Sequence, residues 1–324
     1  MTSVVLNSGA ETSGAVNAPP VNRAALLDLL AMLDRTGYEF VPPTPLTHSR
    51  ALANGAAAGS SVLRRLFGWS APVDRAALPA GLLELMIAAG IAEAHAEGIR
   101  STVRVARCGG LFVHSAFPTD GQDAVFFGPD SVRFARLIAH EIGDCPVDAA
   151  IVDIGTGSGV GALTAARLRP AARVVATDIN PVALDLARVN ATFAGLRVDF
   201  VETGNLDGLG RVDLAVANPP YIIDTAKRRY RDGGDRLGTG VALGMAAAAL
   251  AQLSARGRLI LYTGSPIVDG RDPLRDALEP LCALHDATLR YDELDPDVFG
   301  EELERTEYAG VERIALIAAV AQRR

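Results

Sequence analysis

The residues best suited to chemistry in this chain are those at positions 218–221, which read Asn-Pro-Pro-Tyr. They follow an apolar run at residues 212–217 that predicts a buried strand. Two prolines cannot continue a strand ladder, so we expect a rigid loop at the carboxyl end of that strand. There the side-chain carbonyl of Asn218 and the backbone carbonyl of Pro219 can each accept one N–H of a planar amide or amine. The nitrogen lone pair would then point at an electrophile, with Tyr221 stacked on the flat acceptor.

A glycine-rich loop upstream predicts a cofactor site. Residues 155–161 read Gly-Thr-Gly-Ser-Gly-Val-Gly, directly after an apolar run and directly before a helical pattern. Glycines let the backbone turn tightly and approach a ligand closely. Strand, glycine loop and helix in this order form the nucleotide-binding arrangement of doubly wound folds. The loop residues that we expect to contact the cofactor are Gly155, Thr156, Gly157 and Gly159.

Strand ends nearby carry groups that fit an adenosyl cofactor. Asp153 can reach the amino group of a methionine moiety. Asp178 lies 23 residues after Gly155, followed by Ile179, and can accept hydrogen bonds from both ribose hydroxyls. At the next strand end, the side chains expected to meet the adenine ring are those of Asn205, as an acceptor from the amino group, and Leu206, as a cover for the ring.

These features together favour S-adenosylmethionine (SAM) over a dinucleotide. A dinucleotide fingerprint is also matched, by Gly157, Gly159 and Ala162. Dehydrogenases, however, lack the motif at residues 218–221. Because a sulfonium is already an excellent leaving group, the transfer of its methyl to nitrogen requires mainly alignment of the two reactants.

The elements that must position these residues alternate between helix and strand, which predicts a mostly parallel sheet covered on both faces. The expected helices are 130–142, 159–168, 181–194, 239–254 and 271–284. The expected strands are 149–154, 173–178, 198–202, 212–217, 257–263, 287–292 and 312–320.

The first part of the chain has a different pattern. Residues 1–20 are small and polar and predict a disordered tail. Residues 21–118 predict a small domain of helices, at about 21–37, 51–67 and 82–92, with a short one capped by Asp74. A hairpin of strands 101–106 and 111–114 follows, as in a degenerate winged helix. With nine Arg against seven Asp and Glu, this domain is nearly neutral. We therefore expect a lid or a substrate-selecting domain in preference to a DNA reader.

Composition narrows the class of protein. The chain has 324 residues, 49% of them hydrophobic, and a net charge of −7, which does not favour a large nucleic-acid interface. Three cysteines without a CxxC pair and five scattered histidines predict a reduced cytoplasmic protein with no metal site. We expect no membrane span, because no apolar run is long enough. We expect no signal peptide, because the first residues lack a basic region followed by an apolar stretch.

The paired motifs resemble the class I SAM-dependent methyltransferases of the NPPY type. The similarity is to the HemK-type enzymes that methylate a glutamine amide nitrogen in release factors, and to the wider "small-domain" methyltransferases. It covers about residues 119–324 and implies a Rossmann-like, seven-stranded methyltransferase sheet whose last strand runs antiparallel. The resemblance implies that SAM is held by the glycine loop and Asp178, and that the acceptor amide is held at residues 218–221. Residues 127–131 resemble the family segment beside the cofactor methionine, which adds Phe127 and Ser131 to the expected SAM contacts.

The acceptor stays open. It could be a nucleic-acid base, since adenine offers the same pair of N–H groups, or a small metabolite. SAM could also undergo another alkyl reaction such as cyclisation, or the chain could be a regulator that binds SAM without turnover. Residues 227–231, Lys-Arg-Arg-Tyr-Arg, could grip a phosphate or an acidic substrate, or form an ordinary solvated loop. The acidic segment 293–310 has no functional interpretation from its sequence.

Overall fold

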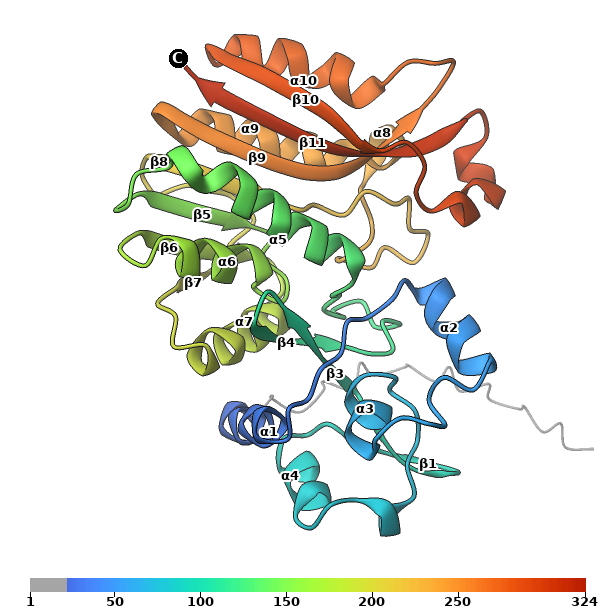
Figure 1. Ribbon diagram of the computed structural model, residues 1–324. Coiled ribbons are helices and arrows are strands. Elements are labelled where there is room, and N and C mark those ends of the chain that lie inside the picture. Colours follow the sequence, from blue (N-terminus) through green and yellow to red (C-terminus); the bar gives the residue numbers. More distant parts are fainter. Residues whose placement is uncertain (1–21) are drawn as a thin grey trace, which may run out of the picture.

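The computed structural model describes residues 22–324 (Figure 1). The disordered tail expected at residues 1–20 lies outside this range. A seven-stranded sheet forms the centre of the molecule, with the strand order β10-β11-β9-β8-β5-β6-β7. Only β11 runs antiparallel to its neighbours, β9 and β10. The strands are β5 (Ala150–Ile154), β6 (Arg173–Asp178), β7 (Asp199–Glu202), β8 (Val212–Ala217), β9 (Leu253–Ile267), β10 (Ala287–Asp295) and β11 (Arg313–Arg323).

Helices cover both faces of this sheet, and each face has its own apolar core. One core joins α5 and α6 to strand residues such as Ile151 and Tyr262. The other joins α9 and α10 to the alternate strand residues, among them Val152 and Leu261. The helices are α5 (Pro129–Glu141), α6 (Val160–Leu168), α7 (Pro181–Phe193), α8 (Asp235–Gly238), α9 (Gly240–Gln252) and α10 (Pro273–Leu284). The predicted doubly wound sheet with an antiparallel last strand is confirmed.

Helix starts follow local capping chemistry. Asn180 caps α7 by accepting a hydrogen bond from the backbone of Val182, and Pro181 occupies the first turn. Asp272 and Pro273 begin α10 in the same way. A side-chain oxygen before the helix satisfies an otherwise unpaired N–H, while proline fits where no N–H partner exists. These caps explain why the predicted starts of these helices lie within about two residues of the observed ones.

The N-terminal part packs against α7 at the β7 end of the sheet (Figure 1). Its buried side chains, such as Leu26, Leu30 and Phe112, share one apolar core with Ala183 and Leu186 of α7. Its elements are α1 (Arg23–Arg35), α2 (Pro45–Ala53), α3 (Val62–Phe67), α4 (Leu82–Ala88), β1 (Ala92–His95), β2 (Gly98–Ser101), β3 (Val103–Cys108) and β4 (Leu111–Ala116).

The local structure differs from the prediction in this part. The helical stretch expected at 51–67 is two helices, α2 and α3, separated by turns. The helix expected at 82–92 ends at Ala88, because Gly90 adopts a φ of +72° and its N–H bonds the carbonyl of Ile87. A β1–β2 hairpin, which the apolar pattern does not predict, follows. The one hairpin that the sequence predicts is present as β3 and β4, and β3 begins about two residues later than predicted.

Candidate active site

One cavity of about 610 Å³ opens at the carboxyl edge of the sheet. It lies where β5, β6, β7 and β8 end, which is the ligand-binding edge of doubly wound sheets. Most of the predicted site residues line it. They are Ser131, Asp153, Gly155, Thr156, Gly157, Asp178, Ile179, Asn205, Leu206, Asn218, Pro219 and Tyr221. The structure therefore brings both predicted motifs to the wall of a single cavity.

The glycine loop has the backbone conformation that a close ligand approach requires. Gly155 and Gly157 have φ values of +67° and +53°, which other residues rarely adopt. Gly159, at φ +89°, does not line the cavity. A Cβ there would stand 3.0 Å from the Cβ of Ala187 on α7. Gly159 thus serves helix packing, while Gly155 and Gly157 face the cavity.

Asp153 is turned toward the start of α6. Its Oδ2 accepts hydrogen bonds from the Thr156 hydroxyl at 2.5 Å and from the Ala162 N–H at 2.8 Å. A Cβ on Gly161 would lie 2.7 Å from this carboxylate, so only glycine fits there. Burial raises the pKa of Asp153 to about 6. The carboxylate both braces the glycine loop and borders the cavity.

Asp178 links the glycine loop to the next strand end. Its Oδ2 accepts from the Gly157 N–H at 2.8 Å and its Oδ1 from the Asn180 N–H at 2.9 Å. Burial raises the pKa of this carboxyl above its ordinary value. Ile179 beside it is exposed at the cavity and presents an apolar surface to a flat ring. This arrangement is consistent with the predicted ribose contact.

The predicted adenine end is shaped by a turn after β7. The Asn205 Oδ1 accepts a hydrogen bond from the Asp207 N–H at 3.1 Å, and Leu206 is buried against the sheet. The Asn205 side-chain carbonyl therefore has an internal partner. The Thr203 hydroxyl also donates to this oxygen at 3.3 Å, so the predicted role of Asn205 as an acceptor from adenine would require one of these partners to be displaced.

The loop at residues 218–221 combines a free amide with a fixed tyrosine. Within residues 22–324, the Asn218 side chain makes no hydrogen bond, although it is half-buried at the cavity wall. Tyr221 is buried, and its hydroxyl donates to the Asp130 Oδ2 at 2.8 Å. The ring packs against Gly264, where a Cβ would stand 2.3 Å from the Tyr221 Cδ2. The motif thus offers one unused acceptor group beside a rigidly held ring.

The segment before α5 differs from the prediction by one residue. Phe127 is buried in the core with Phe134 and does not line the cavity. Its neighbour Phe126 lines the cavity and stacks on Tyr230 with ring centroids 5.7 Å apart. Successive side chains of an extended segment point to opposite sides. Phe126 therefore faces the cavity, while Phe127 faces the core. The Ser131 hydroxyl accepts from the Gly128 N–H at 3.4 Å and closes the first turn of α5.

Asp130 lies in the segment 127–131 expected beside the cofactor, but the sequence does not predict its contacts with tyrosines. It is buried, lines the cavity, and accepts hydrogen bonds from the hydroxyls of both Tyr221 and Tyr262. Arg133 lies 3.4 Å away on the next turn of the helix. Pro129 and the position of Tyr221 after two prolines are the local signals in the sequence. Neither signal predicts the contact between Asp130 and Tyr221, because it joins residues 91 positions apart.

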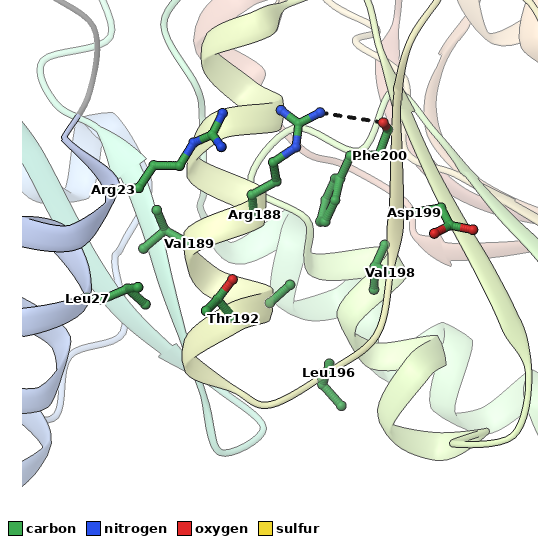
Figure 2. Close-up of a pocket in the computed structure, with 10 residues that line it drawn as sticks. Arg23, Leu27, Arg188, Val189, Thr192, Leu196, Val198, Asp199 and Phe200 are labelled. Atoms are coloured by element: carbon green, nitrogen blue, oxygen red, sulfur yellow. Dashed lines mark hydrogen bonds between the residues drawn. The ribbon is translucent and has the colours of Figure 1, made fainter.

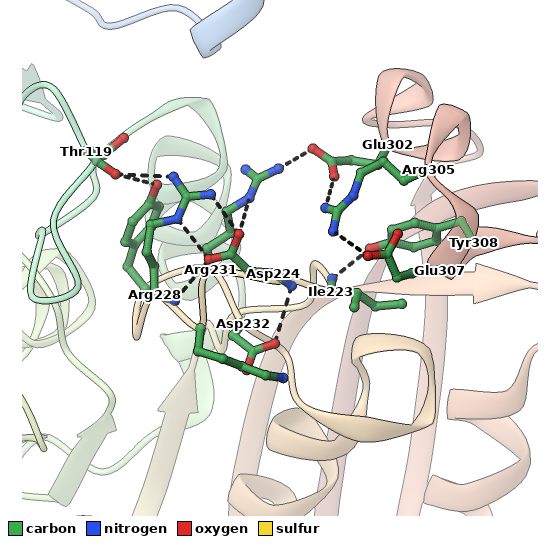
Figure 3. A network of polar contacts seen from close by, with 12 residues as sticks. Thr119, Ile223, Asp224, Arg228, Arg231, Asp232, Glu302, Arg305, Glu307 and Tyr308 are labelled. Atoms are coloured by element: carbon green, nitrogen blue, oxygen red, sulfur yellow. Dashed lines mark hydrogen bonds and ion pairs between the residues drawn. The ribbon is translucent and has the colours of Figure 1, made fainter.

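The basic loop at residues 227–231 is not a free cationic patch. Each of its basic side chains is paired with an acid, and the ion pairs continue into the acidic segment around Glu302 (Figure 3). Arg228 makes the best of these contacts, with two nitrogens on Asp224 at 2.7 and 2.8 Å. This contact holds the pKa of Asp224 at about 2. The pairs are Lys227–Asp232, Arg228–Asp224, Arg229–Asp123 and Arg231–Glu302.

A second cavity, of about 400 Å³, lies apart from these motifs, between α1, α7 and the edge strand β7 (Figure 2). Leu27, Val189 and Phe200 are among its lining residues. Its two arginines, Arg23 and Arg188, both pair with Asp185. Each charged side chain among its described lining residues has an ion-pair partner. In the described residues no three His, Cys, Asp or Glu side chains are arranged to hold a metal ion, and no helix is long and apolar enough to cross a membrane.

Comparison with known proteins agrees with this geometry. Residues 133–266 match the sequence profile of the family "Methyltransferase small domain". The match includes the glycine loop, the two acids predicted to bind the cofactor and residues 218–221, and it indicates SAM as the cofactor. The predicted recognition and cofactor are confirmed.

Several similar proteins are named release factor glutamine methyltransferase. The one from Deinococcus radiodurans is 49% identical over 83 residues, which are 25% of this chain and 30% of the relative. The one from Mycolicibacterium smegmatis is 45% identical over 86 residues, 25% of this chain and 31% of the relative. The chain therefore matches only about a third of the length of these relatives.

Among solved structures, Trm5b from Pyrococcus abyssi is similar with a TM-score of 0.49 and 14% identity. The match covers 71% of this chain and 62% of that one.

Proposed function

We propose that this chain transfers the methyl group of SAM to the side-chain amide nitrogen of a glutamine in a protein. The observation that carries the proposal is the free Asn218 amide beside Pro219, in the cavity that also holds the glycine loop. The names of the relatives support glutamine as the acceptor and a release factor as the protein. When bound, SAM supplies the methyl group of its sulfonium, and the sulfur that remains leaves as a neutral thioether.

The residues present fit this cofactor. Gly155 and Gly157 leave the backbone open to a ligand without a Cβ in the way. Asp178 can accept hydrogen bonds from the ribose hydroxyls, and the apolar Ile179 can lie against adenine. The cavity volume of about 610 Å³ falls within the range of cofactor sites.

The chain's own residues then align the acceptor. The Asn218 Oδ1 and the Pro219 carbonyl accept the two N–H groups of the amide, which fixes the plane of the nitrogen. Tyr221, held by Asp130, supports the flat group from one side. Alignment of this kind can contribute on the order of 7–11 kcal/mol to a reaction barrier. The two carbonyl dipoles also stabilise the positive charge that develops on the nitrogen.

The electrostatics of the cavity mouth do not favour the nucleic-acid alternative. A nucleic-acid enzyme needs unpaired Lys and Arg near its active site to bind phosphates. Here the basic side chains at residues 227–231 are neutralised by the chain's own acids. An uncharged acceptor such as an amide matches this neutral, aromatic mouth better.

The test is methyl transfer from labelled SAM to a purified bacterial release factor, with mass spectrometry to locate the label. We expect one methyl group on a glutamine, and none with the Asn218→Ala variant as the matched control. Adenosine and a primary amine serve as competing acceptors. Label on adenosine or the amine but none on the release factor would overturn the proposal.

A further inference from the structure

Among the described residues that line the cavity, two non-glycine residues have a positive φ, Lys227 and Phe299, and Phe299 is the aromatic one. It has φ +57° and ψ +40°, the left-handed conformation that bulky side chains rarely adopt. The side chain is half-buried and contributes to the cavity wall. Such a conformation is strained and persists only where surrounding contacts impose it, which is common at ligand sites.

The strand order places Phe299 on the acceptor side of the cavity. The expected cofactor residues follow β5, β6 and β7, on one side of β8. Residues 218–221 follow β8 itself. Phe299 follows β10, beyond β9 and β11 on the opposite side. An acceptor held at Asn218 and approached from outside the cofactor site therefore meets Phe299.

Direct contact with the acceptor motif agrees with this position. The rings of Phe299 and Tyr221 meet edge to face, with centroids 5.8 Å apart and planes at 63°. Both rings line the same cavity. This is a favoured aromatic geometry, so the two side chains orient each other. Together they form an apolar boundary next to the expected position of the acceptor.

A polar network adjoins the backbone of Phe299 through Glu302. The Glu302 N–H donates to the Phe299 carbonyl at 2.8 Å. The buried Glu302 carboxylate pairs with Arg231, and with Arg305 at 2.8 Å. Arg231 belongs to the loop that follows residues 218–221, so the network joins Phe299 to the acceptor loop. Figure 3 shows Arg231 reaching across from this loop to Glu302.

A second tie lies close by. The Ile223 N–H donates to the Tyr308 hydroxyl at 2.8 Å, again between the acceptor loop and the acidic segment. Tyr308 is buried. The acidic segment 293–310 is thereby fixed to residues two positions after Tyr221, and it is a wall of the site and not a solvated tail.

We propose that Phe299 is a specificity-determining residue of the acceptor site, and that Glu302 is the positioning residue that holds it. The inference rests on the proposed function, because it concerns the acceptor of that same transfer. The apolar ring admits a flat, uncharged group such as a primary amide. It disfavours a charged amine, which would lose hydration there. We also expect the bulk of the ring to disfavour a purine, which is larger than an amide.

The test compares three variants of the full chain. Phe299→Gly removes the ring at no backbone cost, since glycine adopts φ +57° freely. Glu302→Gln removes the ion pairs but keeps the ring. Glu301→Gln is the matched control, because Glu301 is exposed and, within residues 22–324, makes no ion pair or side-chain hydrogen bond. The acceptors are a release factor, adenosine and a primary amine, and SAM affinity is measured for each variant by calorimetry.

We expect Phe299→Gly to raise the KM for the amide by about fivefold or more, the scale of one lost aromatic contact. Adenosine methylation should rise relative to the amide, while SAM affinity stays unchanged. Glu302→Gln should shift KM in the same direction by a smaller factor, and Glu301→Gln should change nothing. An unaltered acceptor preference in Phe299→Gly, with SAM binding intact, would overturn the inference.

The outcomes separate this inference from the proposed function. If the wild type methylates adenosine or the amine instead of the amide, the proposed function fails. The Phe299 inference is then decided by whether Phe299→Gly changes the KM for that acceptor. A wild type that binds SAM and methylates none of the three acceptors overturns both.

Discussion

The hydroxyl of Tyr221 donates a hydrogen bond to the carboxylate of Asp130 at 2.8 Å, across 91 residues of sequence. The same carboxylate accepts a second hydrogen bond from the Tyr262 hydroxyl at 3.0 Å. Burial, and then the proximity of Asp130, raises the pKa of Tyr221 well above its ordinary value, so its phenol stays protonated and remains a donor. The first turn of α5 thereby fixes the orientation of the acceptor tyrosine.

Tyr221→Phe should therefore reduce turnover while leaving SAM affinity unchanged. The ring remains, but its tether to Asp130 is lost, and a buried acceptor left unsatisfied costs about 1–3 kcal/mol of stability. Tyr262→Phe is the matched control, since it removes the other donor to Asp130 from a residue that does not line the cavity. Thermal unfolding should show similar losses for both variants, and steady-state kinetics should show a change in turnover only for Tyr221→Phe. Equal kinetic losses would mean that Asp130 acts through α5 and not through Tyr221.

Asn218→Ala and Asp178→Ala should separate acceptor binding from cofactor binding. Loss of Asn218 should lower turnover by about a hundredfold or more, the scale for one preorganised group at a transition state, with little change in SAM affinity. Loss of Asp178 should weaken SAM binding by about tenfold or more, because it removes hydrogen bonds to a charged group. Calorimetry with SAM and single-turnover kinetics measure the two effects. Equal weakening of SAM binding in both variants would contradict these roles.

The parts of the site that sequence predicts well are local. The glycine loop, Asp178 and residues 218–221 each follow a strand, and the carboxyl ends of parallel strands meet at one edge. The periodicity of apolar residues, which predicts the strands and helices, is therefore sufficient to predict that these three groups lie together. The motifs favour SAM over a dinucleotide because dehydrogenases lack the motif at residues 218–221, and the family resemblance supports the same cofactor.

The parts that sequence misses depend on contacts between distant segments. Asp130 and Phe299 become site residues only because α5 and the segment after β10 fold against Tyr221. The basic residues at 227–231 suggest a cationic loop because their partners, such as Asp123 and Glu302, lie far away in the chain. In the N-terminal part, the apolar run at 82–92 continues past the end of α4. The helix ends before the run does because Gly90 adopts a positive φ.

SAM affinity should fall as the pH is lowered through about 6. Burial raises the pKa of Asp153 to about 6, so the carboxylate is ionised at pH 7 and increasingly protonated below 6. Only the ionised form attracts the ammonium group of SAM and accepts fully from Thr156 and Ala162. Calorimetric titrations between pH 5 and pH 8 measure the effect. Asp153→Asn, which cannot titrate, should bind SAM more weakly at pH 7 and show no such decline. An affinity independent of pH in the wild type would show that Asp153 only braces the loop.

Asn190 of α7 couples the N-terminal hairpin to the glycine loop. Its Nδ2 donates to the Ser158 carbonyl at 2.9 Å, and its Oδ1 accepts from the His114 N–H at 3.0 Å. The Asn190 Oδ1 also lies 2.9 Å from the Nδ1 of the His114 ring. All three of these contacts are buried. Asn190→Ala should therefore lower the free energy of unfolding by at least about 2 kcal/mol, since more than one buried group loses its partner.

The same substitution should also weaken SAM binding several-fold, because Ser158 belongs to the cavity wall and loses a hydrogen bond that orders the loop. Thr192→Ala, an exposed position on the same helix, is the control and should change neither property. Denaturant unfolding and calorimetry with SAM provide the two readouts. A large loss of stability with unchanged SAM affinity would mean that the hairpin only supports α7, and that the N-terminal part does not communicate with the cofactor site.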